Sequence, residues 1–260
     1  MTSLPFISRL FNLQGQSALV TGAGRGLGEA IARYLASAGA HVHLVARTRA
    51  DLEKVSSAIQ AEGGSASIHP CDVRDTAAVR SMISGLAGLD ILVNNAGTNA
   101  PQPMVEVSDE NLDLMLDLNV RSMYVVAQAA VRKMLETPGR ISRQGVIIHM
   151  SSQMGHVGSP NRTVYCMTKH AIEGLTKAMA VELASQGIRV NSIGPTFVET
   201  PLVRQVVDTP EKQAFVLSHI PMGRLATVDE IAAAALYLAS PSAAMVTGTC
   251  LRVDGGWTAP

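Results

Sequence analysis

The chain has 260 residues, of which 47% are apolar and 16% are charged, and its 21 basic side chains balance 21 acidic ones. An apolar fraction this high excludes intrinsic disorder. The zero net charge argues against a nucleic-acid-binding protein and against a polybasic membrane partner. The length allows one or two domains, and we expect one, because α/β sheets of about 250 residues often form a single unit.

The N-terminal segment and the cysteines bear on where the chain works. Residues 1–16 lack an apolar segment followed by a small-residue cleavage site, so we expect no signal peptide. The longest apolar run, 231–239, is too short to span a bilayer. Cys71, Cys166 and Cys250 form no close pair, which is typical of free thiols in a reducing compartment. We therefore expect a cytoplasmic protein.

Short apolar runs alternate with helical patterns along the whole chain. We expect strands at 17–21, 41–45, 65–71, 90–94, 146–150, 188–193 and 249–253. We expect helices at 26–38, 51–62, 76–86, 111–135, 164–185 and 228–238. This alternation is typical of βαβ units. It predicts one Rossmann domain over residues 1–260, with a doubly wound, parallel, seven-stranded sheet, and a substrate-side lid at 195–222, which is less regular.

The first expected strand leads into a glycine-rich turn that opens the first helix. Gly22, Gly26 and Gly28 follow the spacing G-x-x-x-G-x-G. Arg25 directly precedes Gly26, and Leu27 lies between Gly26 and Gly28. Glycines let a backbone turn sharply and approach a phosphate, and a helix N-terminus attracts the anion. The lysine of a P-loop is absent after these glycines. We predict a dinucleotide site here, and a glycine turn without a ligand is the alternative.

The end of the second strand bears on which dinucleotide binds. An NAD site usually places Asp or Glu there, whereas this chain has Ala46 followed by Arg47 and Arg49. An acid would repel a 2′-phosphate, and arginine offers it a matched fork of donors. Arg25 is a second candidate for the same phosphate. The sequence therefore predicts NADP, with NAD as the alternative, unless Arg47 and Arg49 are only solvated residues at a helix start.

A serine, a tyrosine and a lysine form a candidate acid/base group. Tyr165 and Lys169 lie four residues apart in an expected helix and so share a face, and Ser152 directly follows the fifth strand. A tyrosine with a pKa of about 10 is a poor base at neutral pH, but an ammonium and an oxidised nicotinamide would lower that pKa. Taken alone, such a pair is usually a surface feature and such a serine a turn residue.

Residues 11–16 and the Ala46-Arg47 strand end look similar to gluconate 5-dehydrogenase-like and 3-oxoacyl-carrier-protein reductase-like proteins. A series of motifs resembles the short-chain dehydrogenase/reductase family, to which those proteins belong, over essentially the whole chain. These motifs are the glycine loop, Asp72, Asn94-Asn95-Ala96-Gly97, Asn119, Ser152, Tyr165-x-x-x-Lys169 and Asp254-Gly255-Gly256. The resemblance implies an NADP-preferring oxidoreductase acting on CH–OH groups. It would move a hydride between the nicotinamide and a carbonyl or secondary alcohol carbon.

The resemblance also implies a role for each matching residue. Tyr165 would be the general acid/base, and Lys169 would lower its pKa and hydrogen-bond the nicotinamide ribose. Ser152 would orient the reacting oxygen, and Asn119 would hold a water that links Lys169 to solvent. The cofactor contacts would be Asp72 and Val73 at the adenine, Asn95, Ala96 and Gly97 along the cleft, and Pro195, Val198 and Thr200 at the carboxamide.

Two positions depart from the family pattern. Thr196 stands where a glycine is usual after the sixth strand, and a positive φ there would be strained. Gly24 stands where a serine is common, which removes a possible hydrogen bond to phosphate. These departures weaken the expected backbone contacts near the nicotinamide, but they leave the acid/base group intact.

Other chemistry has weaker support. His41 and His43 lack a third ligand of suitable spacing, so we expect no metal site, and we expect no role for His156 in its loop. Cys166 has no positioned base, and we expect it to pack against neighbouring side chains.

A catalytically inactive nucleotide-binding regulatory or scaffold protein of the same fold is the alternative function. A Rossmann-like methyltransferase is disfavoured, because the second strand ends without an acid.

The substrate stays open among sugar acids, polyols, acyl thioesters and other ketones. The expected lid is rather apolar, and Arg204 is its one cation before Lys212. This composition favours a neutral or partly apolar small molecule. Its apolar side chains are Phe197, Val198, Leu202, Val203, Val206, Val207 and Phe215.

Family members are commonly homotetramers or homodimers in which two long helices pair between subunits. The corresponding helices here are 111–135 and 164–185. Their alanines were expected to provide the small-residue faces for that pairing. These alanines are Ala127, Ala129, Ala130, Ala178, Ala180 and Ala184.

Overall fold

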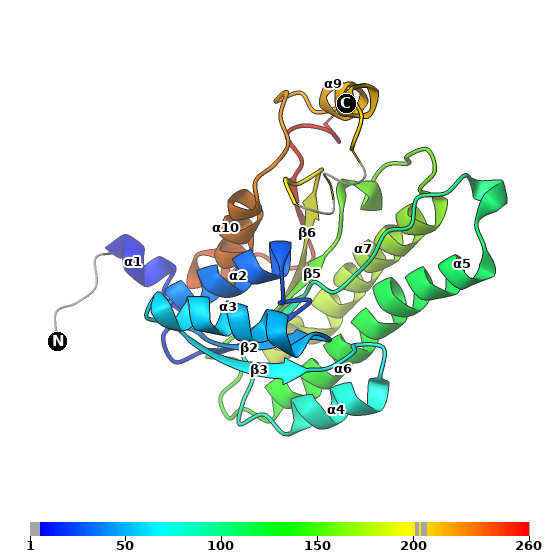
Figure 1. The fold of residues 1–260 in the computed structure, drawn as a ribbon. Coiled ribbons are helices and arrows are strands. Elements are labelled where there is room, and N and C mark those ends of the chain that lie inside the picture. The colour runs from blue at the N-terminus through cyan, green and yellow to red at the C-terminus, as the bar shows by residue number, and fades with distance from the viewer. Residues whose placement is uncertain (1–5, 201–202, 204–206, 260) are drawn as a thin grey trace.

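The computed structural model describes residues 6–200, 203 and 207–259, and it is built around one parallel sheet (Figure 1). The sheet has seven strands in the order β3-β2-β1-β4-β5-β6-β7. The strands are β1 (Ser17–Thr21), β2 (His41–Ala46), β3 (Ser65–Pro70), β4 (Ile91–Asn94), β5 (Gly145–Met150), β6 (Ile188–Pro195) and β7 (Cys250–Val253). The predicted doubly wound α/β fold is confirmed.

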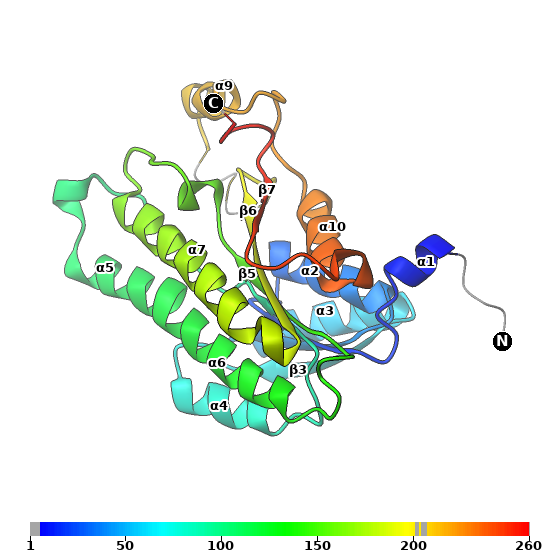
Figure 2. The same ribbon diagram turned by 180° about the vertical axis from the view of Figure 1, so that it is seen from behind.

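Helices cover both faces of this sheet. They are α1 (Phe6–Leu10), α2 (Gly26–Ser37), α3 (Arg49–Ala61), α4 (Thr76–Ser84), α5 (Asp109–Leu116), α6 (Ser122–Leu135), α7 (Thr163–Leu183), α9 (Pro210–Ser218) and α10 (Val228–Ala239). Helices α2, α3 and α10 lie on one face, and α4, α6 and α7 lie on the other (Figure 2). None of the helices in the described ranges is long and apolar enough to cross a membrane.

The two helical layers enclose two hydrophobic cores, one on each side of the sheet. Along β1, Leu19 packs into the core beneath α4, α6 and α7, whereas Val20 packs into the core beneath α2, α3 and α10. Every residue of β4, β5 and β6 is buried, because helices cover both sides of these strands. Fully burying one such side chain stabilises the fold by about 1.5–3 kcal/mol, so the sheet is a rigid base for its loops.

The helix expected at 111–135 is interrupted in the structure. Between α5 and α6, residues Asp117–Arg121 form a turn of π-helix with Asn119 inside it, fully buried. Such π turns are rare and are frequent at functional sites. The Asn119 amide binds both backbone groups of Thr98, because Nδ2 donates to its carbonyl at 2.8 Å and Oδ1 accepts from its N–H at 2.8 Å. Hydrophobic periodicity does not predict a contact of this kind.

The segment predicted as a lid contains a helix, α9, which begins at Pro210 after the cap residue Thr209. Its buried side chain, Val216, belongs to a small third core that includes Phe197 and Trp257, whose rings lie 5.7 Å apart. The helix therefore lies against the C-terminal segment, above the carboxyl edge of the sheet (Figure 1). Three side chains of the predicted lid, Leu202, Arg204 and Val206, fall outside the described residues.

The small-residue faces expected to pair between subunits are mostly internal. Four of the six alanines are buried against the sheet, because a side chain this small lets α6 and α7 approach it closely. These four are Ala127, Ala129, Ala130 and Ala180. Only Ala178 and Ala184 face outward. The exposed faces of the two helices instead carry larger apolar side chains, namely Tyr124, Met167 and Val181.

Candidate active site

A cavity of about 610 Å³ opens at the carboxyl edge of the sheet, where loops leave β1 to β6. Ligands of open α/β sheets bind at this edge. Every predicted site residue except Asn119 lines it. These residues are Gly22, Arg25, Gly26, Leu27, Gly28, Arg47, Asp72, Val73, Asn95, Ala96, Gly97, Ser152, Tyr165, Lys169, Pro195, Val198 and Thr200.

The glycine loop presents backbone groups to this cavity. Gly22 and Gly26 have positive φ angles of 66° and 61°, and α2 begins at Gly26. The cap residue Arg25 makes no side-chain bond to the first turn, so the helix N–H groups are available to an anion. A Cβ on Gly28 would lie 2.2 Å from the carbonyl oxygen of Gly22. The loop can therefore close this tightly only with glycine at that position.

Thr21 and Asn95 join the ends of β1 and β4 beneath the loop. The Thr21 hydroxyl oxygen accepts hydrogen bonds from the backbone N–H groups of Asn95 at 2.9 Å and Ala96 at 3.0 Å. In return, Asn95 Nδ2 donates to the carbonyl of Thr21 at 3.0 Å. Asn95 and Ala96 therefore hold the glycine loop against the neighbouring strand.

Charged side chains gather at the end of the cavity beside β2 and β3. Arg74, which the sequence analysis did not single out, forms an ion pair with Asp72 at 2.7 Å. This guanidinium, and more weakly that of Arg47, holds the pKa of Asp72 below its usual range. Asp51 also lines this end of the cavity. The one sequence signal for Arg74 was its place just after the third strand.

Arg47 and Arg49 do not share this end of the cavity. Arg47 lines it, whereas Arg49 lies outside it and is 3.7 Å from Glu53 on the next turn of α3. Arg47 precedes the cap residue Thr48, whereas Arg49 is the first residue of α3, so the two side chains start from different local structure. The contact of Arg47 with a phosphate stays a prediction, and Arg49 is placed less favourably for one.

Ser152 and Lys169 approach Tyr165 from two elements. Ser152 caps a short 3-10 turn after β5 (Gln153–Gly155), where its hydroxyl accepts from the N–H of Met154 at 3.1 Å and donates to the Gln153 side-chain oxygen at 2.8 Å. Lys169 Nζ lies 5.4 Å from the centre of the Tyr165 ring and donates to the carbonyl of Met150 at 2.7 Å. The tertiary fold thus brings together three residues that the sequence separates.

Burial dominates the ionisation of this group. It raises the pKa of Tyr165 to about 12, although the Ser152 hydroxyl and the Arg162 guanidinium act in the opposite direction. Burial also lowers the pKa of Lys169 to about 8, partly offset by the charge of Glu173. Lys169 was expected to lower the pKa of Tyr165, and the chain by itself does not show this. At neutral pH Tyr165 keeps its proton and can act as an acid.

Asn119 lies behind the cavity rather than in it. Its amide is engaged with Thr98, and Nδ2 also donates to the Thr168 hydroxyl at 3.3 Å. Thr168 precedes Lys169 on α7, so Asn119 ties the π turn to the helix that carries the acid/base pair. The expected water between Asn119 and Lys169 stays a prediction.

Four polar atoms of cavity-lining residues are buried without a hydrogen-bond partner among the described residues. They are Asn99 Oδ1, Ser151 Oγ, Arg162 Nε and Thr196 Oγ1. Leaving such an atom unpaired costs about 1–3 kcal/mol, which a polar ligand would recover. No motif or periodicity marks these atoms, because their isolation depends on tertiary packing. Thr196 also lacks the positive φ that would have strained it.

Arg162 is held at the cavity by an unusual backbone. Asn161, which precedes it, is the one non-glycine residue with a positive φ in the described ranges, at 60°. Strain of this kind is common at functional sites. Arg162 then starts α7 three residues before Tyr165, so its guanidinium lies beside the acid/base group.

Comparisons with known proteins match nearly the whole chain to dehydrogenases and reductases. Residues 22–258 match a family model described as enoyl-(acyl carrier protein) reductase. The chain is 40% identical over 250 residues to L-xylulose reductase of Bos taurus, covering 95% of this chain and 98% of that protein. It is 38% identical over 252 residues to D-threitol dehydrogenase of Mycolicibacterium smegmatis, covering 95% of each. A solved gluconate 5-dehydrogenase from Burkholderia cenocepacia, in complex with NADP and tartrate, matches with a TM-score of 0.91 at 34% identity, covering 98% and 99% of the two chains.

Proposed function

Because the chain belongs to the short-chain dehydrogenase/reductase family of NAD(P)-dependent oxidoreductases, we propose that it moves a hydride between NADP and a small polyhydroxylated substrate. The hydride would join or leave a carbonyl or secondary alcohol carbon. One observation carries the proposal: Ser152, Tyr165 and Lys169 line the same cavity as the glycine loop. Proton transfer and dinucleotide binding can therefore occur at one place.

The residues at the other end of the cavity fit NADP. The open N-terminus of α2 and the glycine loop would hold the pyrophosphate, and Arg47 would meet the 2′-phosphate. Asp72 and Val73 would flank the adenine. Ala46 places no carboxylate at the end of β2, where NAD sites usually have one. The bound cofactor supplies the hydride chemistry, and the protein orients it.

The acid/base group would handle the proton. In reduction the Ser152 hydroxyl holds the carbonyl oxygen of the substrate, and Tyr165 gives its phenol proton to that oxygen as the hydride reaches carbon. The product is the neutral alcohol, and the phenolate left on Tyr165 is stabilised by the Lys169 ammonium. Lys169 can return a proton to the phenolate for two reasons. Its Nζ lies 5.4 Å from the centre of the Tyr165 ring, and its pKa of about 8 is near the working range. In oxidation the same steps run backwards.

The substrate class follows from the polar atoms near Tyr165. A sugar or polyol carries hydroxyls that can satisfy Asn99 Oδ1 and Thr196 Oγ1, and Arg162 can bind a hydroxyl or a carboxylate. The names of the relatives, which refer to xylulose, threitol and gluconate, support this class. The apolar lid alone favours a neutral or partly apolar substrate, but it does not account for the unpaired Nε of the partly buried Arg162 guanidinium.

Assembly and location are also proposals. A homodimer or homotetramer could form through α6 and α7, where the exposed side chains Tyr124, Met167 and Val181 lie on the outer faces. Light scattering tests this, since a single chain of 27.4 kDa would contradict it. The cytoplasmic location stays a prediction from the free cysteines.

The function is tested by following NADPH oxidation with a panel of L-xylulose, erythrulose, a 5-ketogluconate and an acyl thioester ketone. We expect turnover with at least one polyhydroxylated ketone. Bound NADPH without turnover on any carbonyl would instead support the inactive scaffold. Within the panel, Arg162→Met should reduce kcat/KM for the keto acid more than for the neutral ketoses. The matched control is Arg80→Met at an exposed position on α4, and it should leave kcat/KM unchanged for the keto acid and for the neutral ketoses.

A further inference from the structure

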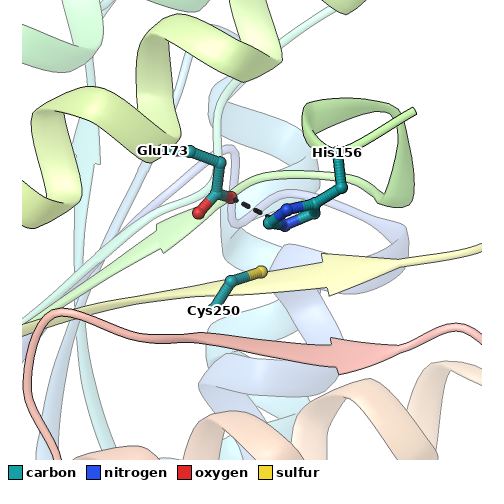
Figure 3. A group of neighbouring side chains, drawn as sticks. All are labelled: His156, Glu173 and Cys250. Carbon is teal, nitrogen blue, oxygen red and sulfur yellow. Dashed lines mark ion pairs between the residues drawn. The ribbon is translucent and has the colours of Figure 1, made fainter. Parts of the chain in front are cut away.

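A second polar cluster lies outside the cavity wall, on the other side of the Ser152 loop. His156 follows the 3-10 turn that Ser152 caps, Glu173 lies one turn beyond Lys169 on α7, and Cys250 begins β7 (Figure 3). The imidazole nitrogen, the carboxylate oxygen and the thiol sulfur all lie within 4.8 Å of one another. His156 Nε2 is 3.7 Å from Glu173 Oε1.

The Glu173 carboxylate is buried with too little compensation. Its residue is only 5% exposed, and His156 is the one basic side chain within ion-pair distance among the described residues. Both carboxylate oxygens accept from a single hydroxyl, that of Ser192, at 3.0 and 2.9 Å. One hydroxyl carries one proton, so it cannot satisfy both oxygens together. The Lys169 ammonium one turn away acts on this carboxylate from beyond ion-pair distance, so a cation bound directly to the carboxylate would stabilise its charge further.

Two glycines let the backbone pack closely against these side chains. A Cβ on Gly155 would lie 3.2 Å from the Glu173 Cγ, and a Cβ on Gly194 would lie 3.0 Å from the Cys250 sulfur. The buried Ser151 hydroxyl, which has no hydrogen-bond partner in the described residues, lies 2.8 Å from the same Gly155 position. The His156 side chain is 26% exposed, which provides a route from solvent.

We propose that His156, Glu173 and Cys250 bind a divalent transition-metal ion of the zinc type, with water in a fourth position. One nitrogen, one oxygen and one sulfur ligand with an open position suit a borderline-soft, tetrahedral ion. A carboxylate and a thiolate together balance its two positive charges. Ser192 would hold the carboxylate from behind, as outer hydrogen bonds do at metal sites.

Binding must displace a proton from the thiol. The thiolate, and not the thiol, is the form of cysteine that binds a metal ion. The metal–sulfur bond forms as the S–H bond breaks, and the proton leaves to solvent, with no change of oxidation state. Metal affinity should therefore rise with pH.

The site would brace the acid/base group without touching substrate. His156 follows Ser152 by four residues, and Glu173 follows Lys169 by four, so one ion would fix the Ser152 loop to α7 and to β7. The sequence analysis expected no metal and no role for His156, because the three ligands come from distant segments of the chain. Metal binding is independent of the proposed reaction and can be measured without a substrate.

The test is to strip the full-length chain of metal and titrate it with Zn²⁺ and with Co²⁺. We expect one ion per chain, a higher Tm with Zn²⁺, and a thiolate-to-cobalt charge-transfer absorption. Cys250→Ser, His156→Asn and Glu173→Gln should each weaken Zn²⁺ binding by at least tenfold. The double variant Cys166→Ser and His170→Asn, which changes the same residue types on α7, is the control and should bind as the wild-type chain does.

Three outcomes would overturn the proposal. The first is a folded wild-type chain that binds no Zn²⁺. The second is bound Co²⁺ without a thiolate band, which decides the matter even where a ligand variant fails to fold. The third is binding that is lost in His43→Asn but kept in Cys250→Ser, because His43 and His69 place two ring nitrogens 3.0 Å apart elsewhere in the sheet.

Discussion

The two ends of the cavity are built in different ways. At the cofactor end, Gly22, Gly26 and Gly28 present backbone groups from one continuous turn. At the substrate end, Tyr165 and Lys169 are side chains whose pKa values are moved by burial, to about 12 and about 8. Under the proposed function, backbone shape would serve cofactor binding, whereas the burial of side chains would serve proton transfer. Changes at one end should therefore alter affinity and changes at the other should alter turnover.

Apart from a change of Tyr165 itself, the largest effect is expected from Lys169→Met at the substrate end. The variant removes the ammonium beside Tyr165, so kcat should fall by roughly 10²–10⁴. The free energy of unfolding should not fall with it, because burial disfavours the lysine charge and methionine has a similar length. Kinetics and urea denaturation measure the two quantities. Lys177→Met, an exposed lysine on the same helix, should leave both unchanged, and a stability loss that matches the activity loss would contradict the contrast.

At the cofactor end, Arg47→Asp should change specificity rather than turnover. Losing a charge-assisted contact to the 2′-phosphate and adding an acid there should lower the NADPH-to-NADH ratio of kcat/KM by roughly 10–100-fold. Arg49→Asp is the matched control, because Arg49 lies outside the cavity beside Glu53. If both variants shift the ratio equally, Arg47 has no special contact with the cofactor.

Gly28→Ala tests whether shape is what the glycine loop contributes. The added Cβ would lie 2.2 Å from the Gly22 carbonyl oxygen, so the loop must shift. We expect the free energy of unfolding to fall by about 1–3 kcal/mol and NADPH affinity to fall with it. Gly174→Ala places the same methyl group on an exposed turn of α7 with nothing nearby, and it should gain about 0.5–1 kcal/mol. If the two substitutions change the free energy of unfolding equally, the glycine loop can accommodate a Cβ at position 28.

The effect that appears only at acid pH concerns His149, on β5 just before the serines. It is fully buried with neither ring nitrogen hydrogen-bonded in the described structure, and burial lowers its pKa to about 4. As the pH falls, His149 therefore takes up a proton in the unfolded chain at a higher pH than in the folded chain. The free energy of unfolding falls as the pH drops from about 6.5 towards 4. Between pH 7 and pH 5 the wild-type chain should lose roughly 2 kcal/mol more than His149→Asn. Denaturant melts at both pH values measure this, with His170→Asn expected to follow the wild type.

Sequence reasoning predicted the parts of the site that local patterns encode. The glycine turn and the Tyr165–Lys169 pair are short motifs, and alternating strands and helices fix the sheet that brings them together. It missed the Arg74–Asp72 pair, the isolated polar atoms near Arg162 and the π turn around Asn119. These features depend on contacts between distant segments or on which side chains remain unpaired after packing. Hydrophobic periodicity predicts neither the contacts nor the unpaired side chains.

The most direct test compares cofactor binding with turnover in Tyr165→Phe. This change removes one hydroxyl and leaves the ring and the cavity wall in place. The account predicts a fluorescence-measured NADPH affinity within about threefold of the wild type, with kcat for carbonyl reduction lowered by roughly 10³ or more, and no change in the exposed control Tyr124→Phe. A Tyr165→Phe chain that reduces its substrate at nearly the wild-type rate would contradict it.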